Sequence, residues 1–157
     1  MRKEKKRTCL WIALLLCTGI PAFAQDAAAD AKGAEQAMMD YLDGFYEGDT
    51  AKIIRSVLPE VAKYGYWKDE KTGKYGGEAM SFQEMLNYAN RVKERKRFPK
   101  PDAPKKAELF EVQDQTASGK VTAWWGTDYI LLGKYDGKWK IVQVLWQGPL
   151  GGERVRG

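Results

Sequence analysis

The chain has 157 residues, with 26 Lys or Arg and 21 Asp or Glu, so its formal net charge is +5 at neutral pH. Residues 1–24 hold five of the basic residues, one acidic residue and both cysteines; the other 133 residues carry a net charge of +1 and contain no Cys or His. After residue 24 this composition gives no electrostatic basis for a nucleic-acid or anionic-membrane partner. It also excludes disulfides, thiol catalysis, His-based triads and the usual zinc ligand sets.

The N-terminus has the order of a secretory signal peptide. A basic segment at residues 2–7 precedes an apolar run at residues 10–20, and Ala22-Phe23-Ala24 then places small residues at the two specificity positions. We predict cleavage after Ala24 and export to the periplasm or the medium. The apolar run is shorter than the ~20 residues that a spanning helix needs, so no integral membrane segment is expected after cleavage. Lipidation at Cys17 is an alternative, but Leu16 precedes it where a small residue is expected.

The first half of the remaining chain predicts helices. One becomes clear at residue 34 and ends at Gly48, and a short second helix follows it and stops at Pro59. The first helix has an apolar stripe at helical spacing, composed of Ala34, Ala37, Met38, Tyr41, Leu42 and Phe45. The second carries Ile53, Ile54, Val57 and Leu58 on one side.

A β-hairpin and a third helix come next. Residues 61–68 and 74–77 predict the two strands, with turn-forming residues 69–73 between them. The third helix begins at Ser81, because Ser81 and Glu84 form a capping box, and it should fray near Phe98 and Pro99. Residues 99–104 contain three prolines and predict a stiff connector.

The second half predicts an antiparallel meander of three strands at residues 107–116, 120–134 and 138–147. Ser118-Gly119 and Asp136-Gly137 are the expected breaks, and Asp-Gly between apolar runs is a strong hairpin signal. Residues 148–157 are rich in Gly and predict a flexible tail. We therefore expect a single α+β domain over residues 25–147, with helices covering one face of a curved sheet.

Two segments resemble the nuclear-transport-factor-2-like superfamily. Residues 41–49, Tyr-Leu-Asp-Gly-Phe-Tyr-Glu-Gly-Asp, resemble the end of its first helix, where a Gly-Asp pair ends the helix. Residues 128–132 followed by 136–142 resemble the closing hairpin of its "putative lumazine-binding" branch. The resemblance covers most of residues 34–147 and implies a cone-like curved antiparallel sheet around a long helix, an open pocket and, often, a homodimer. The superfamily contains enzymes, binding proteins and proteins of no known activity, so the fold does not choose among them.

Tyr41 is the first candidate site residue. It lies seven residues before Gly48, and in the ketosteroid isomerases, a distant enzyme branch of the superfamily, a Tyr at this distance donates the oxyanion-hole hydrogen bond. The resemblance implies that role for Tyr41, but the general-base Asp of that branch falls on Gly65 here. The alternative is that Tyr41 packs its ring on the sheet with its hydroxyl hydrogen-bonded.

Asp128 is the second candidate. In a regular strand it shares a face with Trp124, Gly126 and Ile130, which places an ionisable group among apolar neighbours. If that face lines the pocket, burial would favour the neutral carboxyl and could make it an acid or a hydrogen-bond donor. The alternative is a structural Asp that satisfies backbone groups at a bulge beside Gly126 or pairs with a Lys across strands.

Aromatic residues are abundant, with five Trp, eight Tyr and four Phe after residue 24. Rings with a few polar tips suit a small apolar or aromatic ligand, although rings also fill cores and dimer faces. No phosphate-binding loop, nucleophile elbow or metal-ligand cluster occurs, so neither a cofactor nor a metal is expected. The predicted ligand-binding residues are Tyr41, Phe45, Tyr66, Trp67, Trp124, Asp128 and Trp146.

Three functions remain open from the sequence. The first is an exported, non-catalytic ligand-binding or accessory domain. The second is a cofactor-independent enzyme of isomerase, dehydratase or hydrolase type on a small hydrophobic substrate, with Tyr41 and Asp128 as hydrogen-bond donor and acid or base. The third is a protein-binding module whose sheet forms a homodimer or docks a partner. The basic residues between 91 and 106 could attract an anion, but a solvated helix end explains them more simply.

Overall fold

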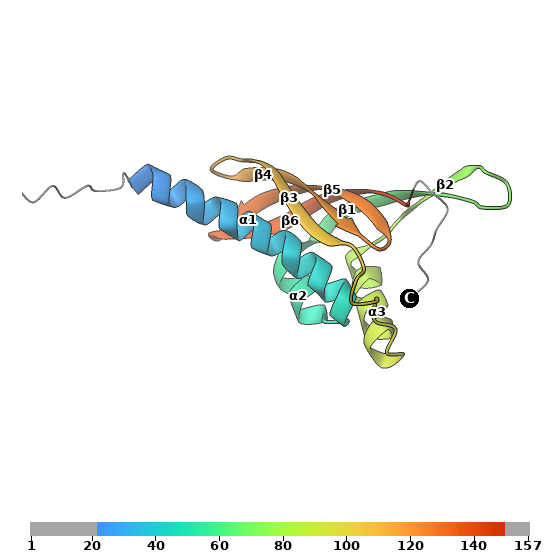
Figure 1. Ribbon diagram of the computed structural model, residues 1–157. Helices are drawn as coiled ribbons and strands as arrows, with labels where there is room; N and C mark the ends of the chain where they lie inside the picture. Colours follow the sequence, from blue (N-terminus) through green and yellow to red (C-terminus); the bar gives the residue numbers. More distant parts are fainter. Residues whose placement is uncertain (1–21, 150–157) are drawn as a thin grey trace, which may run out of the picture.

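The computed structural model describes residues 22–149, so most of the predicted signal peptide and all but two residues of the predicted tail lie outside the described residues. The described residues form three helices and six strands, whose arrangement is shown in Figure 1. None of the helices within residues 22–149 has the length and apolar character needed to cross a bilayer. In chain order the elements are α1 (Ala22–Glu47), α2 (Thr50–Ser56), β1 (Val57–Lys68), β2 (Tyr75–Ala79), α3 (Phe82–Glu94), β3 (Lys105–Val112), β4 (Thr116–Ala123), β5 (Gly126–Tyr135) and β6 (Lys138–Gln147).

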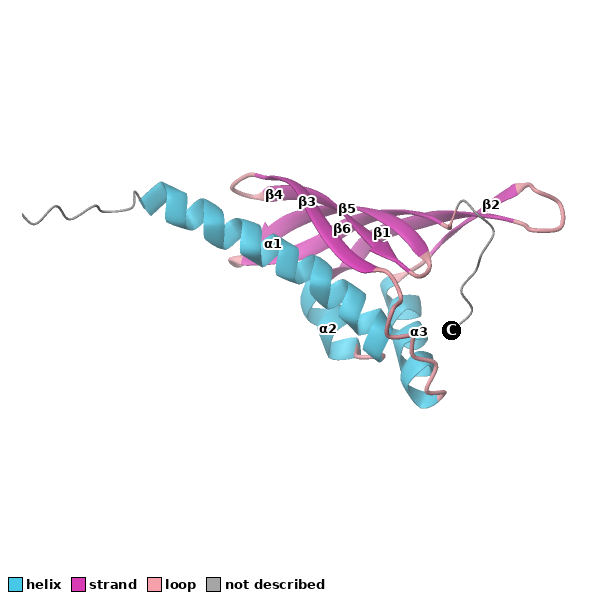
Figure 2. Cartoon of the chain, in the orientation of Figure 1, coloured by secondary structure: helices cyan, strands magenta, loops and turns pink. Residues whose placement is uncertain are grey.

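The six strands form one curved sheet in the order β2-β1-β6-β5-β4-β3. All three helices lie on the same side of it (Figure 2), which confirms the predicted α+β arrangement. Neighbouring strands are antiparallel except β1 and β6, which pair in parallel. The expected sheet was antiparallel throughout. A parallel pair needs a long crossover connection, and α3 together with the rest of the sheet supplies it here.

Helix α1 runs along the concave face of the sheet and forms the centre of the core (Figure 1). It starts at Ala22, well before the predicted periodic region at residue 34. The apolar stripe is confirmed, because each of its six residues is at most 5% exposed. Burial of this stripe supplies the main hydrophobic contribution that holds the helix on the sheet. The six residues are Ala34, Ala37, Met38, Tyr41, Leu42 and Phe45.

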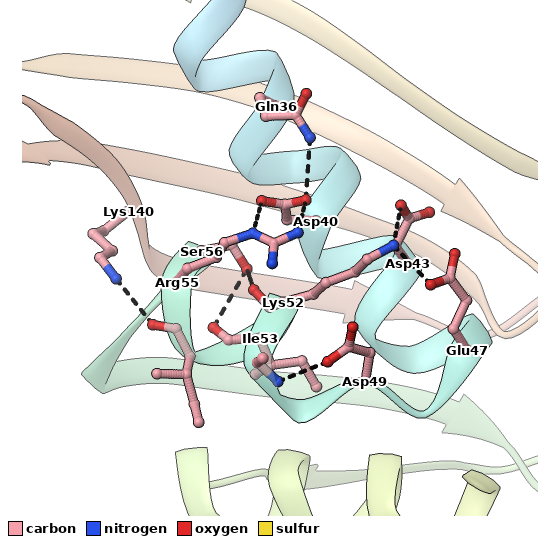
Figure 3. A network of polar contacts seen from close by, with 12 residues as sticks. Gln36, Asp40, Asp43, Glu47, Asp49, Lys52, Ile53, Arg55, Ser56 and Lys140 are labelled. Atoms are coloured by element: carbon pink, nitrogen blue, oxygen red, sulfur yellow. Dashed lines mark hydrogen bonds and ion pairs between the residues drawn. The ribbon is translucent and has the colours of Figure 1, made fainter.

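Ion pairs connect α2 to α1 (Figure 3). Arg55 donates from Nε and Nη2 to the two carboxylate oxygens of Asp40, at 2.5 and 2.7 Å, a bidentate arrangement on a carboxylate that is almost buried. Lys52 bridges Asp43 and Glu47 at 2.9 and 2.7 Å. These contacts join the last turns of α1 to α2 and set the direction in which the chain enters β1.

The end of the second helix differs from the prediction. Helix α2 stops at Ser56, and Val57, Leu58 and Pro59 already belong to β1. The register between β1 and β6 shifts between Val57 and Ala62, so Pro59 falls in an irregular stretch of the strand. A Pro is tolerated there because no ladder hydrogen bond requires its missing N–H.

One of the two predicted breaks in the meander was misplaced. Ser118 and Gly119 lie inside β4, and the preceding turn is at residues 113–115, where the Gln113 amide donates to the Thr116 carbonyl at 2.8 Å. Gly119 is needed for packing, since a Cβ there would lie 2.7 Å from the Met38 sulfur. The turn that Asp136-Gly137 predicts is confirmed, with positive φ at both residues as a two-residue hairpin requires.

The predicted strand at residues 120–134 is in fact two strands. A tight turn at Trp124 and Trp125 separates β4 from β5, and Gly126 follows with a φ of 125°. A Cβ at Gly126 would lie 2.1 Å from the Gln147 carbonyl oxygen, so only glycine fits. Two consecutive Trp residues favour a strand, which is why the sequence pattern hides this turn.

Helix α3 begins where the sequence predicts. The Ser81 side chain accepts from the Glu84 amide and the Glu84 carboxylate accepts from the Ser81 amide, which completes the capping box. The helix ends at Glu94, four residues before the expected fraying point at Phe98, and Lys96 has a positive φ of 51°. Residues 95–104 therefore connect α3 to β3 without regular secondary structure.

Candidate functional site

A cavity of about 730 Å³ opens between the end of α1, helix α3 and the inner face of the sheet. Its volume is within the range of small-molecule binding sites. The base of the β1–β2 hairpin forms one side, and Gly148 and Pro149, just after β6, also line it. The Gly148 amide donates to the Tyr66 carbonyl at 2.9 Å, so the first residues of the predicted tail are held against β1.

The walls of the cavity are largely aromatic. Phe45 comes from α1 and Tyr88 from α3, and their ring centroids are 5.7 Å apart in an edge-to-face arrangement. Phe45 also meets Trp125, at 5.5 Å between centroids. Together these rings offer both faces and edges to a planar ligand. The six aromatic residues that line the cavity are Phe45, Trp67, Tyr88, Trp124, Trp125 and Trp146.

A buried polar cluster centred on Asp128 lies beside this aromatic cavity. Its Oδ1 accepts from the Trp125 indole Nε1 at 2.9 Å, and its Oδ2 accepts from the Tyr41 hydroxyl at 2.5 Å and from Lys63 Nζ at 3.3 Å. Lys63 also donates to the Tyr41 hydroxyl oxygen at 2.5 Å. Asp128 and Tyr41 are completely buried, and the Lys63 side chain is 9% exposed. Three donors therefore surround the buried carboxylate and replace the hydrogen bonds that it would make with water.

The Tyr41 hydroxyl is held in its neutral form. Burial, and after it the adjacent Asp128 carboxylate, raise the pKa of Tyr41 well above its ordinary value. The hydroxyl donates a hydrogen bond to Asp128 and accepts one from Lys63. The hydroxyl therefore has no second proton to donate to a bound substrate, which is what an oxyanion hole would require.

Gly65 occupies the position where the isomerase base was expected, and it leaves no room for a side chain. A Cβ there would lie 1.9 Å from a carbon of the Trp146 ring. The ring is fixed by its own hydrogen bond, in which Trp146 Nε1 donates to the Trp125 carbonyl at 3.1 Å. Glycine at this position thus allows Trp146 to lie across β1 as a cavity wall, and no carboxylate is present there.

A comparison with known protein families shows which family the chain belongs to. The family described as "Putative lumazine-binding" matches residues 29–147, which includes every strand and most of α1. The chain belongs to this family. No curated protein matches the chain.

Solved structures of low sequence identity show the same fold as this family member. An NTF2-like protein with a cystatin-like fold from Novosphingobium aromaticivorans superposes with a TM-score of 0.57 at 10% identity, covering 86% of this chain and 91% of that chain. An NTF2-like protein of unknown function from Methylobacillus flagellatus gives 0.55 at 18%, covering 77% and 93%. Another, from Silicibacter pomeroyi, gives 0.54 at 16%, covering 75% and 95%. The fold is therefore the nuclear-transport-factor-2-like cone, with a curved, unclosed sheet around α1.

The site residues predicted from the sequence fall into three groups. Four line the cavity: Phe45, Trp67, Trp124 and Trp146. Tyr41 and Asp128 meet each other, as expected of residues on α1 and β5 that face the same side, but they lie behind the cavity wall. Tyr66 lies on the opposite face of β1, 43% exposed and in edge contact with Tyr64.

Sequence reasoning missed Lys63, Tyr88 and the role of Trp125. A signal for Lys63 was present, because alternation from the buried Val61 puts Lys63, Gly65 and Trp67 on the inner face of β1. The possibility that Asp128 pairs with a Lys across strands was also open, and Lys63 is that partner. Trp125 could not be assigned, because the turn that aims its indole at Asp128 was taken as continuous strand.

The part of the chain that the structure describes contains no cluster of three or more His, Cys, Asp or Glu side chains suited to a metal ion. The residues that line the cavity instead bring the Lys63 ammonium, rim side chains of both signs, Asn87 and the Trp124 indole N–H, which has no hydrogen-bond partner among the described residues. The arrangement favours packing against rings and a small number of hydrogen bonds.

We expect Tyr41→Phe to lower the free energy of unfolding by ~1–3 kcal/mol, because Lys63 and Asp128 each lose a buried hydrogen-bond partner. The control is Tyr75→Phe, whose side chain is 57% exposed, and its effect should stay within about 0.5 kcal/mol. Denaturant unfolding of both variants at neutral pH measures the difference. Equal stability of the two variants would contradict the assigned role of the Tyr41 hydroxyl.

The same variant should change the pH dependence of stability. Because the folded-state pKa of Tyr41 is raised, its contribution is complete below about pH 10, the ordinary Tyr value, and falls as pH rises above it. The free energy of unfolding of Tyr41→Phe should therefore fall less than that of the wild type as the pH rises above about 10.

Proposed function

We propose that this domain binds a small, planar ring compound in the aromatic cavity and catalyses no reaction on it. The observation that carries the proposal is the convergence of six aromatic side chains from α1, α3, the β1–β2 hairpin and the strand ends on one open cavity of about 730 Å³. A ring-lined cavity favours planar apolar ligands, since aromatic side chains have few rotamers and lose little side-chain entropy on binding.

The polar cluster supports binding over catalysis. Tyr41 and Asp128, the two candidates for acid–base chemistry, are fully buried and satisfy each other. Gly65 supplies no general base. A general acid or base must come within hydrogen-bond reach of the proton that it transfers, and neither Tyr41 nor Asp128 lines the cavity.

Lumazine is a suitable first probe, because it is planar and the family description names it. We expect Trp67→Ala to weaken its binding about tenfold, through loss of one stacking wall. Tyr75→Ala is the control, since Tyr75 is an exposed aromatic residue on β2 that does not line the cavity, and this variant should bind lumazine as the wild type does. Titration monitored by lumazine fluorescence measures both affinities. Equal losses in the two variants, or no binding to the wild type, would oppose the proposed site.

We propose in addition that the chain is exported and cleaved after Ala24. The basic segment, the short apolar run and Ala22-Phe23-Ala24 support this proposal. Intact-mass measurement on protein recovered from the envelope or the medium of the native host should give a species that begins at Gln25. Recovery of a species that retains residues 1–24 would refute export by cleavage.

A second copy of the chain is the partner that we propose for the outer face of the sheet. Five large apolar or aromatic side chains on β1, β5 and β6 are 42–53% exposed there: Tyr64, Tyr66, Tyr129, Leu131 and Leu145. Leu145 is central, because its Cα pairs with Tyr64 on one side and Tyr129 on the other. Apolar patches of this kind favour association of two sheets.

Leu145→Glu should therefore produce a monomer at concentrations where the wild type is a dimer, because it places a charge at the centre of the patch. Lys71→Glu, in the exposed β1–β2 turn, is the charge-changing control and should remain dimeric. Sedimentation analysis distinguishes the two states, and a monomeric wild type would refute the proposed dimer.

A further inference from the structure

Lys63 connects the buried polar cluster to the cavity. It is the member of the Asp128–Tyr41–Lys63 group that lines the cavity, while the other two lie behind the wall. Its ammonium lies 5.2 Å from the centre of the Tyr41 ring and 5.8 Å from that of Phe45. Any ligand that fills the inner end of the cavity must therefore meet this ammonium.

The ammonium has one N–H left for a ligand. Of its three donors, one is used by the Tyr41 hydroxyl oxygen and one by Asp128 Oδ2. Among residues 26–149 no third acceptor for Lys63 is found. A ligand that offers one hydrogen-bond acceptor would satisfy the remaining donor, and a purely apolar ligand would leave it unsatisfied.

The charge of the ammonium is already compensated. Asp128 is completely buried, and its Oδ2 lies 3.3 Å from Lys63 Nζ. A carboxylate placed on Lys63 would join Asp128 around a single positive charge and leave a net negative charge in an aromatic setting. Burying an uncompensated charge is costly, so the pair opposes anionic ligands.

The rim of the cavity does not change this balance. Lys68 and Arg91 contribute two positive charges, and Glu70, Glu78 and Glu84 contribute three negative ones. Arg91 lies against the Tyr88 ring, 5.7 Å from its centre. The rim therefore adds no surplus of positive charge that would draw an anion inward.

We infer that the natural ligand is a neutral planar ring compound whose carbonyl oxygen accepts a hydrogen bond from Lys63, and that the buried Asp128 excludes carboxylate analogues. This inference rests on the proposed function, because it names the ligand class of the same cavity. The ring would pack between the Trp side chains and Phe45, with its carbonyl oxygen directed toward Lys63 on β1. Asp128 is then a specificity-determining residue that acts through Lys63 and does not touch the ligand.

Two probes of matched shape test the inference: 2-naphthamide, which offers a neutral carbonyl, and 2-naphthoate, which offers a carboxylate. Their dissociation constants are measured at pH 7 by quenching of Trp fluorescence. We expect the wild type to bind 2-naphthamide at least tenfold more tightly than 2-naphthoate. Lys63→Met should weaken 2-naphthamide about tenfold, through loss of the hydrogen bond and its charge assistance.

Asp128→Asn provides the decisive comparison, because it removes the compensating charge and keeps the size of the side chain. We expect this variant to bind 2-naphthoate at least tenfold more tightly than the wild type does, since Lys63 would then lack its ionised partner. Lys138→Met removes an exposed lysine outside the cavity; it is the control and should leave the ratio of the two affinities unchanged. Thermal unfolding of each variant establishes that it is folded.

The outcomes separate the two proposals. If neither probe binds the wild type, the proposed ligand-binding function fails, and this inference fails with it. If both bind, wild-type preference for 2-naphthoate overturns the inference alone. So does an unchanged ratio in folded Asp128→Asn, which would show that the general apolar character of the cavity sets the preference. If Asp128→Asn does not fold, the Lys63→Met variant carries the test, because unchanged 2-naphthamide affinity in that variant would also overturn the inference.

Discussion

The buried carboxylate of Asp128 is the interaction on which the site depends. A fully buried charge on the inner face of β5 must be satisfied by protein groups, and here the donors come from α1, β1 and the β4–β5 turn. Tyr41 ties the helix to the sheet, Lys63 ties the opposite half of the sheet to β5, and Trp125 is aimed inward by the same contact. One residue thus fixes the relative positions of the elements that form the inner wall of the cavity.

As a consequence, two sets of side chains have different roles. Tyr41 and Asp128 hold the wall, while Lys63 and the six aromatic residues face the cavity. The superfamily fold accommodates both enzymes and binding proteins, so the decision between them must come from the site. In this chain Tyr41 and Asp128, the two acid–base candidates predicted from the sequence, are directed at each other, and the cavity beside them is lined by aromatic rings and Lys63.

Much of the fold could be predicted from the sequence, because local signals and packing requirements agree there. The periodic stripe of α1, the capping box at Ser81 and the Asp136-Gly137 hairpin each have a local physical cause. The parallel pairing of β1 with β6 depends on contacts between distant segments. The turn at Trp124 and Trp125 is hidden by residues that favour strands. The contact between Tyr41 and Asp128 could be predicted, because the apolar stripe of α1 and the inner face of β5 face each other. The contact of Lys63 with Asp128 could not, because it depends on the strand order that places β6 between β1 and β5.

A crystal structure of the domain with lumazine tests the central claim most directly, because it locates the ligand and its hydrogen bonds together. We expect the ring to lie between Phe45 and the Trp side chains of the cavity, with a carbonyl oxygen within hydrogen-bond distance of Lys63 Nζ and the Tyr41–Asp128 hydrogen bond unbroken. A ligand bound outside this cavity, or one held directly by the Tyr41 hydroxyl after that hydrogen bond has opened, would contradict it.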